Sequence, residues 1–306
     1  MIVPVHGEAK FLAEAIRSIY EQRTQEAFEV VFVLDRASSQ AIQTIEHMLD
    51  ANARVVRSKV PGIAHAHNSG LRSAKFDLVA IMHSDDIMAP DRLEIQSQIL
   101  RKQPDLVCVG GQVELTNSHG DHLSRVCLPR GKKECRFTMK HYCCLFHPTV
   151  MYRKNVALRV GGYDQRYVPA EDYHLWLRML QHGEIRNTNH VLLRYRIHEK
   201  QTSQQEAHAH TKMKTKILFE YKWRNRNRTK QRMPGLLSYR RSLAFSRLFE
   251  ELTLKRNQRL HLLSMIRYIS LVFLRPISVT LLLKKHVCQK FANRSLVYKK
   301  AHKNER

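Results

Sequence analysis

The first 110 residues alternate between short apolar runs and segments with helical periodicity. Apolar side chains at Leu12, Ile16 and Ile19, for example, recur at the spacing of one helix face. The apolar runs are rich in β-branched residues, which are typical of buried strands. They cover residues 2–5, 28–34, 54–57, 78–82 and 106–109. This alternation predicts βαβ units and an α/β fold with a mostly parallel sheet.

The pattern is less regular after residue 110. It predicts strands over residues 150–152 and 191–197, with a helix over residues 171–181 that ends near Gly183. From about residue 204 onward the chain is strongly basic. The sequence predicts helices there, with a break at Pro234 and Gly235. We therefore expect a globular domain over residues 1–205 and a basic α-helical extension over residues 206–306.

The charge of this 306-residue chain is unevenly distributed. Its formal net charge is +25, and residues 206–306 contain 25 Lys and Arg against 5 Asp and Glu. The first 205 residues contain 27 basic and 22 acidic residues, so they are nearly balanced. A basic segment is attracted to a polyanion, either a nucleic acid or an anionic membrane surface. The aromatic residues of this segment follow no base-stacking pattern, so we expect no nucleic-acid partner and keep that function as an alternative.

The very apolar stretch over residues 262–283 bears on the membrane alternative. Arg267 and Arg275 lie within it, and charges at that depth make a bilayer-spanning helix costly. We expect instead a helix lying in the membrane interface, with a helix packed on the domain or on a partner protein as the alternative. The first residues lack both a basic leader and a long apolar core, so no secretory signal peptide is expected. These features predict a cytoplasmic protein, peripheral on the inner face of the cell membrane.

The cysteines suggest neither a disulfide framework nor an obvious zinc site. No CxxC pair occurs, which favours a reducing compartment. One cluster has the residue types of a zinc site, but its spacing does not fit a zinc module. It consists of Cys135, His141, Cys143, Cys144 and His147.

Polar side chains follow the predicted strands where a parallel sheet would bind its ligand. Asp85 and Asp86 follow the fourth apolar run after His83 and Ser84, and adjacent carboxylates repel each other unless a cation lies between them. Oxygen ligands of this kind suit Mg²⁺ or Mn²⁺ bound to a diphosphate, although an Asp pair can also simply cap the next helix.

A second acidic pair, Glu171 and Asp172, begins the predicted helix over residues 171–181. The helix dipole stabilises negative charge at this position. A carboxylate held there can accept a proton from a hydroxyl group, or it can be an ordinary charge at a helix start. The spacing alone does not choose between these two roles.

Segments spread over residues 1–203 add specific information because they occur together and in a fixed order. They are "VPVHGEAKFLAEAIRSIYEQ", "FEVVFVLDRASS", "PGIAHAHNSGLRSAKFDLVAIMHSDDIMAPDRLEIQ", "HPTVMYRKNVALRVGGYD", "EDYHLWLRM" and "LLRYRIHEKQTS". In these segments the chain resembles the family-two inverting glycosyltransferases with the GT-A fold, of the bacterial envelope polysaccharide type. The resemblance implies transfer of a sugar from a nucleotide-diphosphate donor to a hydroxyl of a glycan or lipid-linked acceptor.

The resemblance also implies roles for individual residues. Asp172 would be the catalytic base, and the cofactor would be Mn²⁺ or Mg²⁺. The metal ligands would come from Asp85, His83, Asp86 and His198. The residues that would bind the nucleotide-sugar are Pro4, Val5, Glu8, Asp35, Asn68, His83, Asp85 and Arg196.

The chain departs from the family pattern at several of these positions. His83 replaces the usual first Asp of an Asp-x-Asp motif, and His67 replaces the usual Arg before Asn68. Such changes around one pocket are compatible with an altered donor preference or with a non-catalytic, glycosyltransferase-like membrane scaffold. The presence of Asp85 and Asp172 favours an active enzyme.

Overall fold

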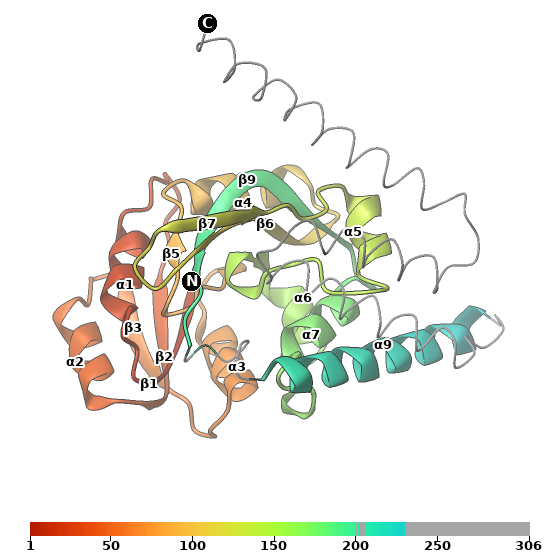
Figure 1. Cartoon of the computed structure of the whole chain (residues 1–306). Coiled ribbons are helices and arrows are strands. Elements are labelled where there is room, and N and C mark those ends of the chain that lie inside the picture. The colour runs from red at the N-terminus through yellow and green to blue at the C-terminus, as the bar shows by residue number, and fades with distance from the viewer. Residues whose placement is uncertain (200, 202–205, 230–306) are drawn as a thin grey trace, which may run out of the picture. The chain divides into compact units, whose positions relative to one another are not determined.

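The structure is a computed structural model, and it describes residues 1–199, 201 and 206–229 (Figure 1). The apolar stretch over residues 262–283, for which the sequence predicts a membrane-interface helix, lies outside these described residues. None of the helices that the structure describes is long and apolar enough to cross a bilayer.

The N-terminal half contains the parallel sheet that the sequence predicts. Its 3 strands lie in the order β1 (Ile2–Gly7), β2 (Val30–Ala37) and β3 (Ala53–Arg57), and both pairings are parallel. The connecting helices are α1 (Leu12–Tyr20), α2 (Ser39–His47) and α3 (Ile63–Ser73). Every residue of β1 before His6 is buried, as expected for a strand covered on both faces. The predicted βαβ arrangement is therefore confirmed in this half.

The second sheet has 6 strands and mixed directions. Its order is β4 (Leu78–Ala80), β8 (Met151–Arg153), β6 (Leu106–Thr116), β9 (Glu184–Arg196) and β5 (Ile87–Met88), with β7 (His122–Val126) paired to β6. Strands β6 and β9 are parallel, whereas the pairings β4–β8, β6–β8, β5–β9 and β6–β7 are antiparallel. Strands β5 and β7 were not predicted, because one is only two residues long and the other is mostly exposed and polar.

The two sheets meet where the chain leaves β4. Ile81 forms a parallel bridge with Ile2, and the Met82 N–H donates a 3.0 Å hydrogen bond to the Ile2 carbonyl oxygen. The buried guanidinium of Arg92, at the start of α4 (Arg92–Lys102), donates to the carbonyl oxygens of Ile81 and Val150 at 2.8 and 3.1 Å. These bonds fix the position of the turn that follows β4, which carries His83, Asp85 and Asp86.

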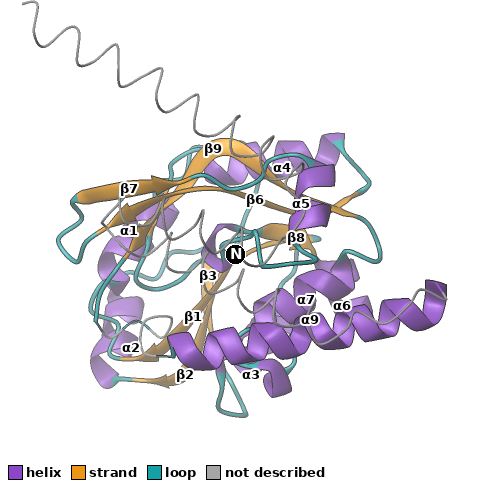
Figure 2. Cartoon of the chain, turned by 45° about the vertical axis from the view of Figure 1, so that its right-hand side comes forward, coloured by secondary structure: helices purple, strands orange, loops and turns teal. Residues whose placement is uncertain are grey.

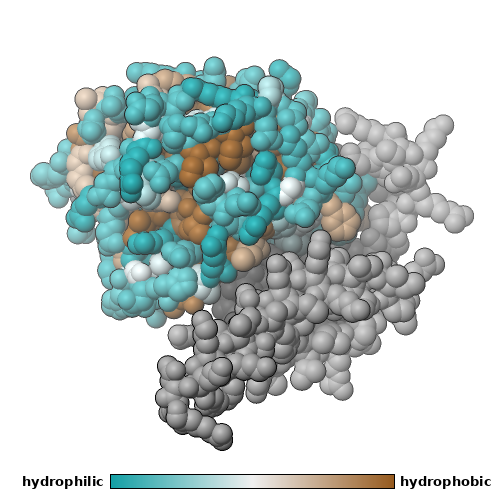
Figure 3. Space-filling view, turned by 90° about the horizontal axis from the view of Figure 1, so that it is seen from above, coloured by the Kyte–Doolittle hydropathy of each residue, from teal (hydrophilic) through white to brown (hydrophobic). Residues whose placement is uncertain are grey.

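Helix α7 (Glu171–Met179) packs against α6 (Lys154–Arg159) and α9 (Ala207–Thr229), whereas α5 (Lys132–Thr138) packs against β9 (Figure 2). The short 3-10 helices η1 (His147–Thr149) and η2 (Gln165–Tyr167) precede α7 in the chain. Ile217 and Leu218 of α9 are buried in the same apolar cluster as Trp176 of α7. The Tyr167 hydroxyl also donates a 2.5 Å hydrogen bond to Glu220. The beginning of the basic segment therefore packs on the α/β domain. The face of the described residues seen in Figure 3 is hydrophilic around its rim and has apolar residues near its centre.

Candidate active site

Strand pairing brings the turn after β4 beside the end of β9. Ile87 and Met88 of β5 pair antiparallel with Arg194 and Leu193, so the residues just before β5 lie beside those just after Arg194. The Arg196 N–H donates to Asp86 Oδ1 at 2.9 Å, and the His198 imidazole donates from Nε2 to Asp85 Oδ2 at 3.0 Å. Residues more than a hundred positions apart in the chain thus form one cluster.

The two carboxyl groups of this cluster have different environments. Asp86 is fully buried, and burial together with the neighbouring Asp85 charge raises its pKa well above the usual value. Burial also acts to raise the pKa of Asp85, but the hydrogen bond from His198 and the nearby His83 outweigh it, so this pKa is lowered. A cation bound between two such carboxylates would offset their mutual repulsion.

The donor set of the turn suits a hard divalent cation. His83, Asp85 and Asp86 each offer one ligand atom, and these atoms lie within 4.8 Å of one another. Asp86 Oδ2 is buried and has no hydrogen-bond partner, so one carboxylate oxygen is available for a ligand. Two carboxylates and one imidazole match the preferences of Mn²⁺, and to a lesser degree those of Mg²⁺. His198 lies beside this set and contacts it through Asp85.

Arg196 is held mainly by protein groups. Only 2% of it is exposed, and its guanidinium donates to the Asp85 carbonyl oxygen at 3.0 Å and to Glu14 at 2.6 Å. It also lies over the Phe11 ring, with Cζ 4.2 Å from the ring centre. These contacts make Arg196 a positioning residue for Asp85, and its predicted contact with the donor stays a prediction.

The proposed nucleotide end of the site lies at the ends of β1 and β2. Asp35 is 5% exposed, and its Oδ2 accepts a 3.1 Å hydrogen bond from the Gly62 N–H before α3. Its carbonyl oxygen lies 2.8 Å from His6 Nδ1. Pro4 and Val5 are buried within β1, and Glu8 is exposed just after it. Their predicted contacts with a nucleotide stay predictions.

Asn68 has a clear structural role. Its side-chain amide donates to the Tyr163 carbonyl oxygen at 2.7 Å, and its Oδ1 accepts from the Tyr163 N–H at 2.9 Å. Both contacts bind α3 to the loop before α7. The sequence predicts a nucleotide-sugar contact for Asn68, and the structure shows these two contacts with the protein itself.

The acidic pair lies in the first turn of α7, as the sequence predicts. Asp172 Oδ1 accepts a 2.6 Å hydrogen bond from the Tyr173 N–H, and burial raises the pKa of its carboxyl. Glu171 is 6% exposed, and burial together with the Asp172 charge raises its pKa to about 8. A carboxylate with a raised pKa is a stronger base than an exposed one.

A histidine cluster connects the turn after β4 to α7. His67, His147 and Glu171 offer ligand atoms within 4.8 Å of one another, and the ring centres of His147 and His83 are 5.5 Å apart. Burial lowers the pKa of His67 to about 3, so its imidazole is neutral. Sequence reasoning missed this cluster because His67, His147 and Glu171 are distant in the chain and lie in three different helices. The sequence signals were His67 standing where the related family has Arg, and His147 within a different group of candidate zinc ligands.

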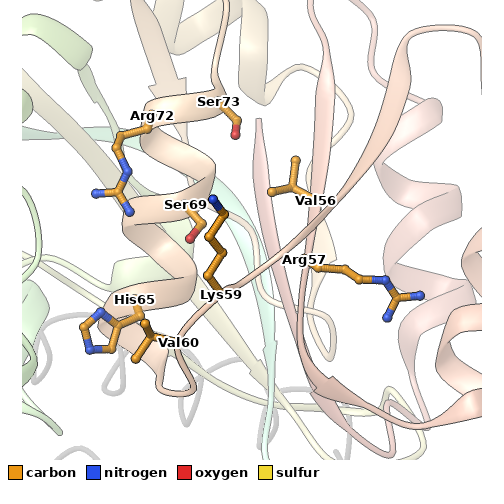
Figure 4. Close-up of a pocket in the computed structure, with 8 residues that line it drawn as sticks. All are labelled: Val56, Arg57, Lys59, Val60, His65, Ser69, Arg72 and Ser73. Carbon is orange, nitrogen blue, oxygen red and sulfur yellow. The ribbon is translucent and has the colours of Figure 1, made fainter.

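A cavity of about 270 Å³ lies between β3 and α3, away from these carboxylates (Figure 4). The residues that line it are Val56, Arg57, Lys59, Val60, His65, Ser69, Arg72 and Ser73. None of the predicted donor, metal or catalytic residues lines this cavity, so it is separate from the site described above.

Comparison with known proteins identifies the family. Residues 1–161 match the model of the protein family described as "Glycosyl transferase family 2". The chain belongs to this family. The O-antigen biosynthesis glycosyltransferase WbnJ of Escherichia coli is 32% identical over 210 residues, which are 67% of this chain and 81% of WbnJ. The UDP-Gal:alpha-D-GlcNAc-diphosphoundecaprenol beta-1,3-galactosyltransferase of Escherichia coli is 29% identical over 190 residues, which are 60% of this chain and 67% of that protein.

A solved structure supports the fold of this family-two glycosyltransferase. The mannosyltransferase PcManGT from Pyrobaculum calidifontis, in complex with GDP-Man and Mn²⁺, has a TM-score of 0.54 at 16% identity. The match covers 88% of this chain and 79% of PcManGT. The predicted GT-A fold and the predicted glycosyltransferase activity are thereby confirmed.

Proposed function

We propose that this family-two enzyme is a metal-dependent, inverting glycosyltransferase that uses a nucleotide-diphosphate sugar. The observation that carries the proposal is the continuity between the turn after β4 and α7. The ring of His83 meets the ring of His147, and His147 in turn lies close to Glu171, the neighbour of Asp172. Contacting side chains therefore join the cation-binding group to the helix turn that carries Asp172.

In this proposal the donor diphosphate lies at the turn after β4. His83, Asp85 and Asp86 would hold Mn²⁺ or Mg²⁺, which when bound neutralises charge on the leaving diphosphate. His198 and Arg196 position Asp85 through the hydrogen bonds described above. The GDP-Man and Mn²⁺ in the PcManGT structure support both the donor class and the ion.

Asp172 acts as the general base. Its carboxylate accepts the proton of the acceptor hydroxyl, and the resulting oxygen attacks the anomeric carbon from the face opposite the diphosphate. The bond to the diphosphate breaks as the new glycosidic bond forms, so the anomeric configuration inverts. Burial contributes by raising the basicity of Asp172, and a positioned base accelerates such a step by about 10²–10⁴-fold.

A variant of Asp172 tests this assignment. We expect Asp172→Asn to lower transfer by about 10²–10⁴-fold while nucleotide-sugar binding is retained. The control is Asp164→Asn, which removes a nearby carboxylate that is paired with Arg166 at 2.7 Å. Donors are screened as a panel of nucleotide sugars, and the released nucleotide diphosphate is measured. A full rate for Asp172→Asn would remove this residue from the role of base.

The acceptor and the location of the enzyme belong to the same proposal. The names of the two Escherichia coli relatives, one for O-antigen and one for a diphosphoundecaprenol-linked sugar, support a glycan or lipid-linked acceptor. The basic residues after position 205 would hold the enzyme on the cytoplasmic membrane face, at about 1 kcal/mol for each residue near the surface. Co-sedimentation of the full chain with anionic vesicles, but not with neutral vesicles, tests this part.

A further inference from the structure

Behind the proposed donor site, three buried side chains present polar atoms to one another. His67 is 0% exposed, His147 is 9% exposed and Glu171 is 6% exposed. Each contributes an atom to a group whose members lie within 4.8 Å. They come from α3, η1 and the first turn of α7, which are distant in sequence.

The hydrogen-bonding capacity of this group is largely unused. Neither ring nitrogen of His67 has a hydrogen-bond partner, and Glu171 Oε2 has none either. Buried polar atoms in folded proteins nearly always have a partner, so unpartnered atoms that face one another need an explanation. A cation bound between them supplies a partner to one ring nitrogen of His67 and to Glu171.

The chemistry of the group favours a particular class of ion. Two imidazoles and one carboxylate form a set typical of Zn²⁺, with nitrogen ligands at about 2.0–2.1 Å and a fourth position left for water. The turn after β4 offers two carboxylates and one imidazole instead, and that oxygen-rich set favours Mn²⁺ or Mg²⁺. The two groups therefore differ in the ion that they prefer.

We propose that His67, His147 and Glu171 form a zinc site, separate from the proposed donor metal site. Tyr163 contacts both imidazoles of the group. The Tyr163 hydroxyl lies 2.9 Å from His147 Nε2, and the Tyr163 ring stacks on His67 with 4.7 Å between ring centres. Hydrogen bonds of this kind orient ligand imidazoles. The ion links α3, η1 and α7, and it fixes the His147 ring against His83.

Metal titration of the full chain tests the site without any assay of sugar transfer. Protein freed of metal with a chelator is titrated with Co²⁺, whose visible absorption reports a tetrahedral site, and then with Zn²⁺. We expect one equivalent of Co²⁺ to give these bands and Zn²⁺ to displace it. His67→Gln and Glu171→Gln should each remove the bands and weaken Zn²⁺ binding by at least about 100-fold.

Matched variants separate this site from its neighbour. His65→Gln changes another, partly exposed histidine of α3, and Asp85→Asn changes the oxygen-rich group. Both should keep the cobalt bands. The proposal is overturned if the unaltered chain gives no bands, or if Asp85→Asn removes them while His67→Gln keeps them. Circular dichroism checks that each variant folds. If His67→Gln does not fold, the cobalt titration of Glu171→Gln, which preserves side-chain shape, tests the site instead. The proposed transfer reaction does not use this zinc ion. If the titration shows no zinc site, the proposed reaction therefore still stands.

Discussion

The main-chain N–H of Arg196 donates a 2.9 Å hydrogen bond to Oδ1 of Asp86, 110 residues earlier in the chain. The same arginine donates from Nε to the Asp85 carbonyl oxygen at 3.0 Å. Arg196, the last residue of β9, thus contacts the carboxylate of Asp86 and the main-chain carbonyl oxygen of Asp85. The rigidity of the proposed metal site therefore depends on β9 as much as on the turn itself.

Replacing Arg196 by Lys should destabilise the protein. A lysine ammonium cannot reproduce the planar arrangement that reaches the Asp85 carbonyl oxygen, Glu14 and the Phe11 ring, so a buried cation loses most of its partners. We expect a loss of about 2–4 kcal/mol in the free energy of unfolding, measured by urea denaturation. Arg194→Lys on the same strand is the control, because its side chain is 59% exposed and its pairing with Glu114 at 3.6 Å is worth little. Equal losses in both variants would contradict this role of Arg196.

Asp86→Asn should separate metal binding from stability. The amide keeps an oxygen that can accept from the Arg196 N–H, so the stability of the metal-free protein should change by less than about 1 kcal/mol. Mn²⁺ binding, measured by calorimetry, should weaken by at least about 10-fold because an anionic ligand is lost. Asp91→Asn, an exposed acidic residue nearby, should leave Mn²⁺ binding unchanged. Unaltered Mn²⁺ affinity in Asp86→Asn would exclude Asp86 as a ligand.

The pH dependence of transfer should report the state of Asp172. Burial raises the pKa of this carboxyl and the Lys214 ammonium opposes the shift, so the pKa lies above 3.8. Because the base acts only when ionised, kcat/KM should increase with pH through that raised pKa. Lys214→Met removes the opposing charge, and the acid limb should then move to higher pH. Lys216→Met on the same helix is the control, and a shift toward lower pH in Lys214→Met would contradict the assignment.

Two glycines with positive φ should respond differently to substitution. A Cβ at Gly162, where φ is +69°, would overlap Asn68 Oδ1, whereas a Cβ at Gly7, where φ is +55°, would meet no atom within 4 Å. Gly7→Ala should therefore cost about 1 kcal/mol, from backbone strain alone. Gly162→Ala should cost about 2–3 kcal/mol, because the hydrogen bonds between Asn68 and Tyr163 are also disturbed. Urea denaturation measures both, and equal costs would show that the contact with Asn68 is unimportant.

The sequence predicted those features whose signals are local. Strands such as β2 are continuous apolar runs, and the acidic start of α7 is visible in "EDYHLWLRM". The mixed second sheet was missed because its order depends on pairings between distant segments, such as β6 with β9. Among the site residues, Asp85 and His198 were predicted together as metal ligands from the family resemblance. Their contact, the support from Glu14 and the cluster around His67 arise only from tertiary packing, which no spacing along the chain reveals.

The docking of α9 has a practical consequence for work with shorter versions of the enzyme. Ile217 and Leu218 cover apolar side chains of the catalytic region, although they lie in a segment whose sequence is strongly basic. A protein truncated after residue 205 would uncover that patch and lose the Lys214 charge near Asp172. Truncation beyond residue 229 would leave both intact, so solubility and turnover should be compared between these two end points.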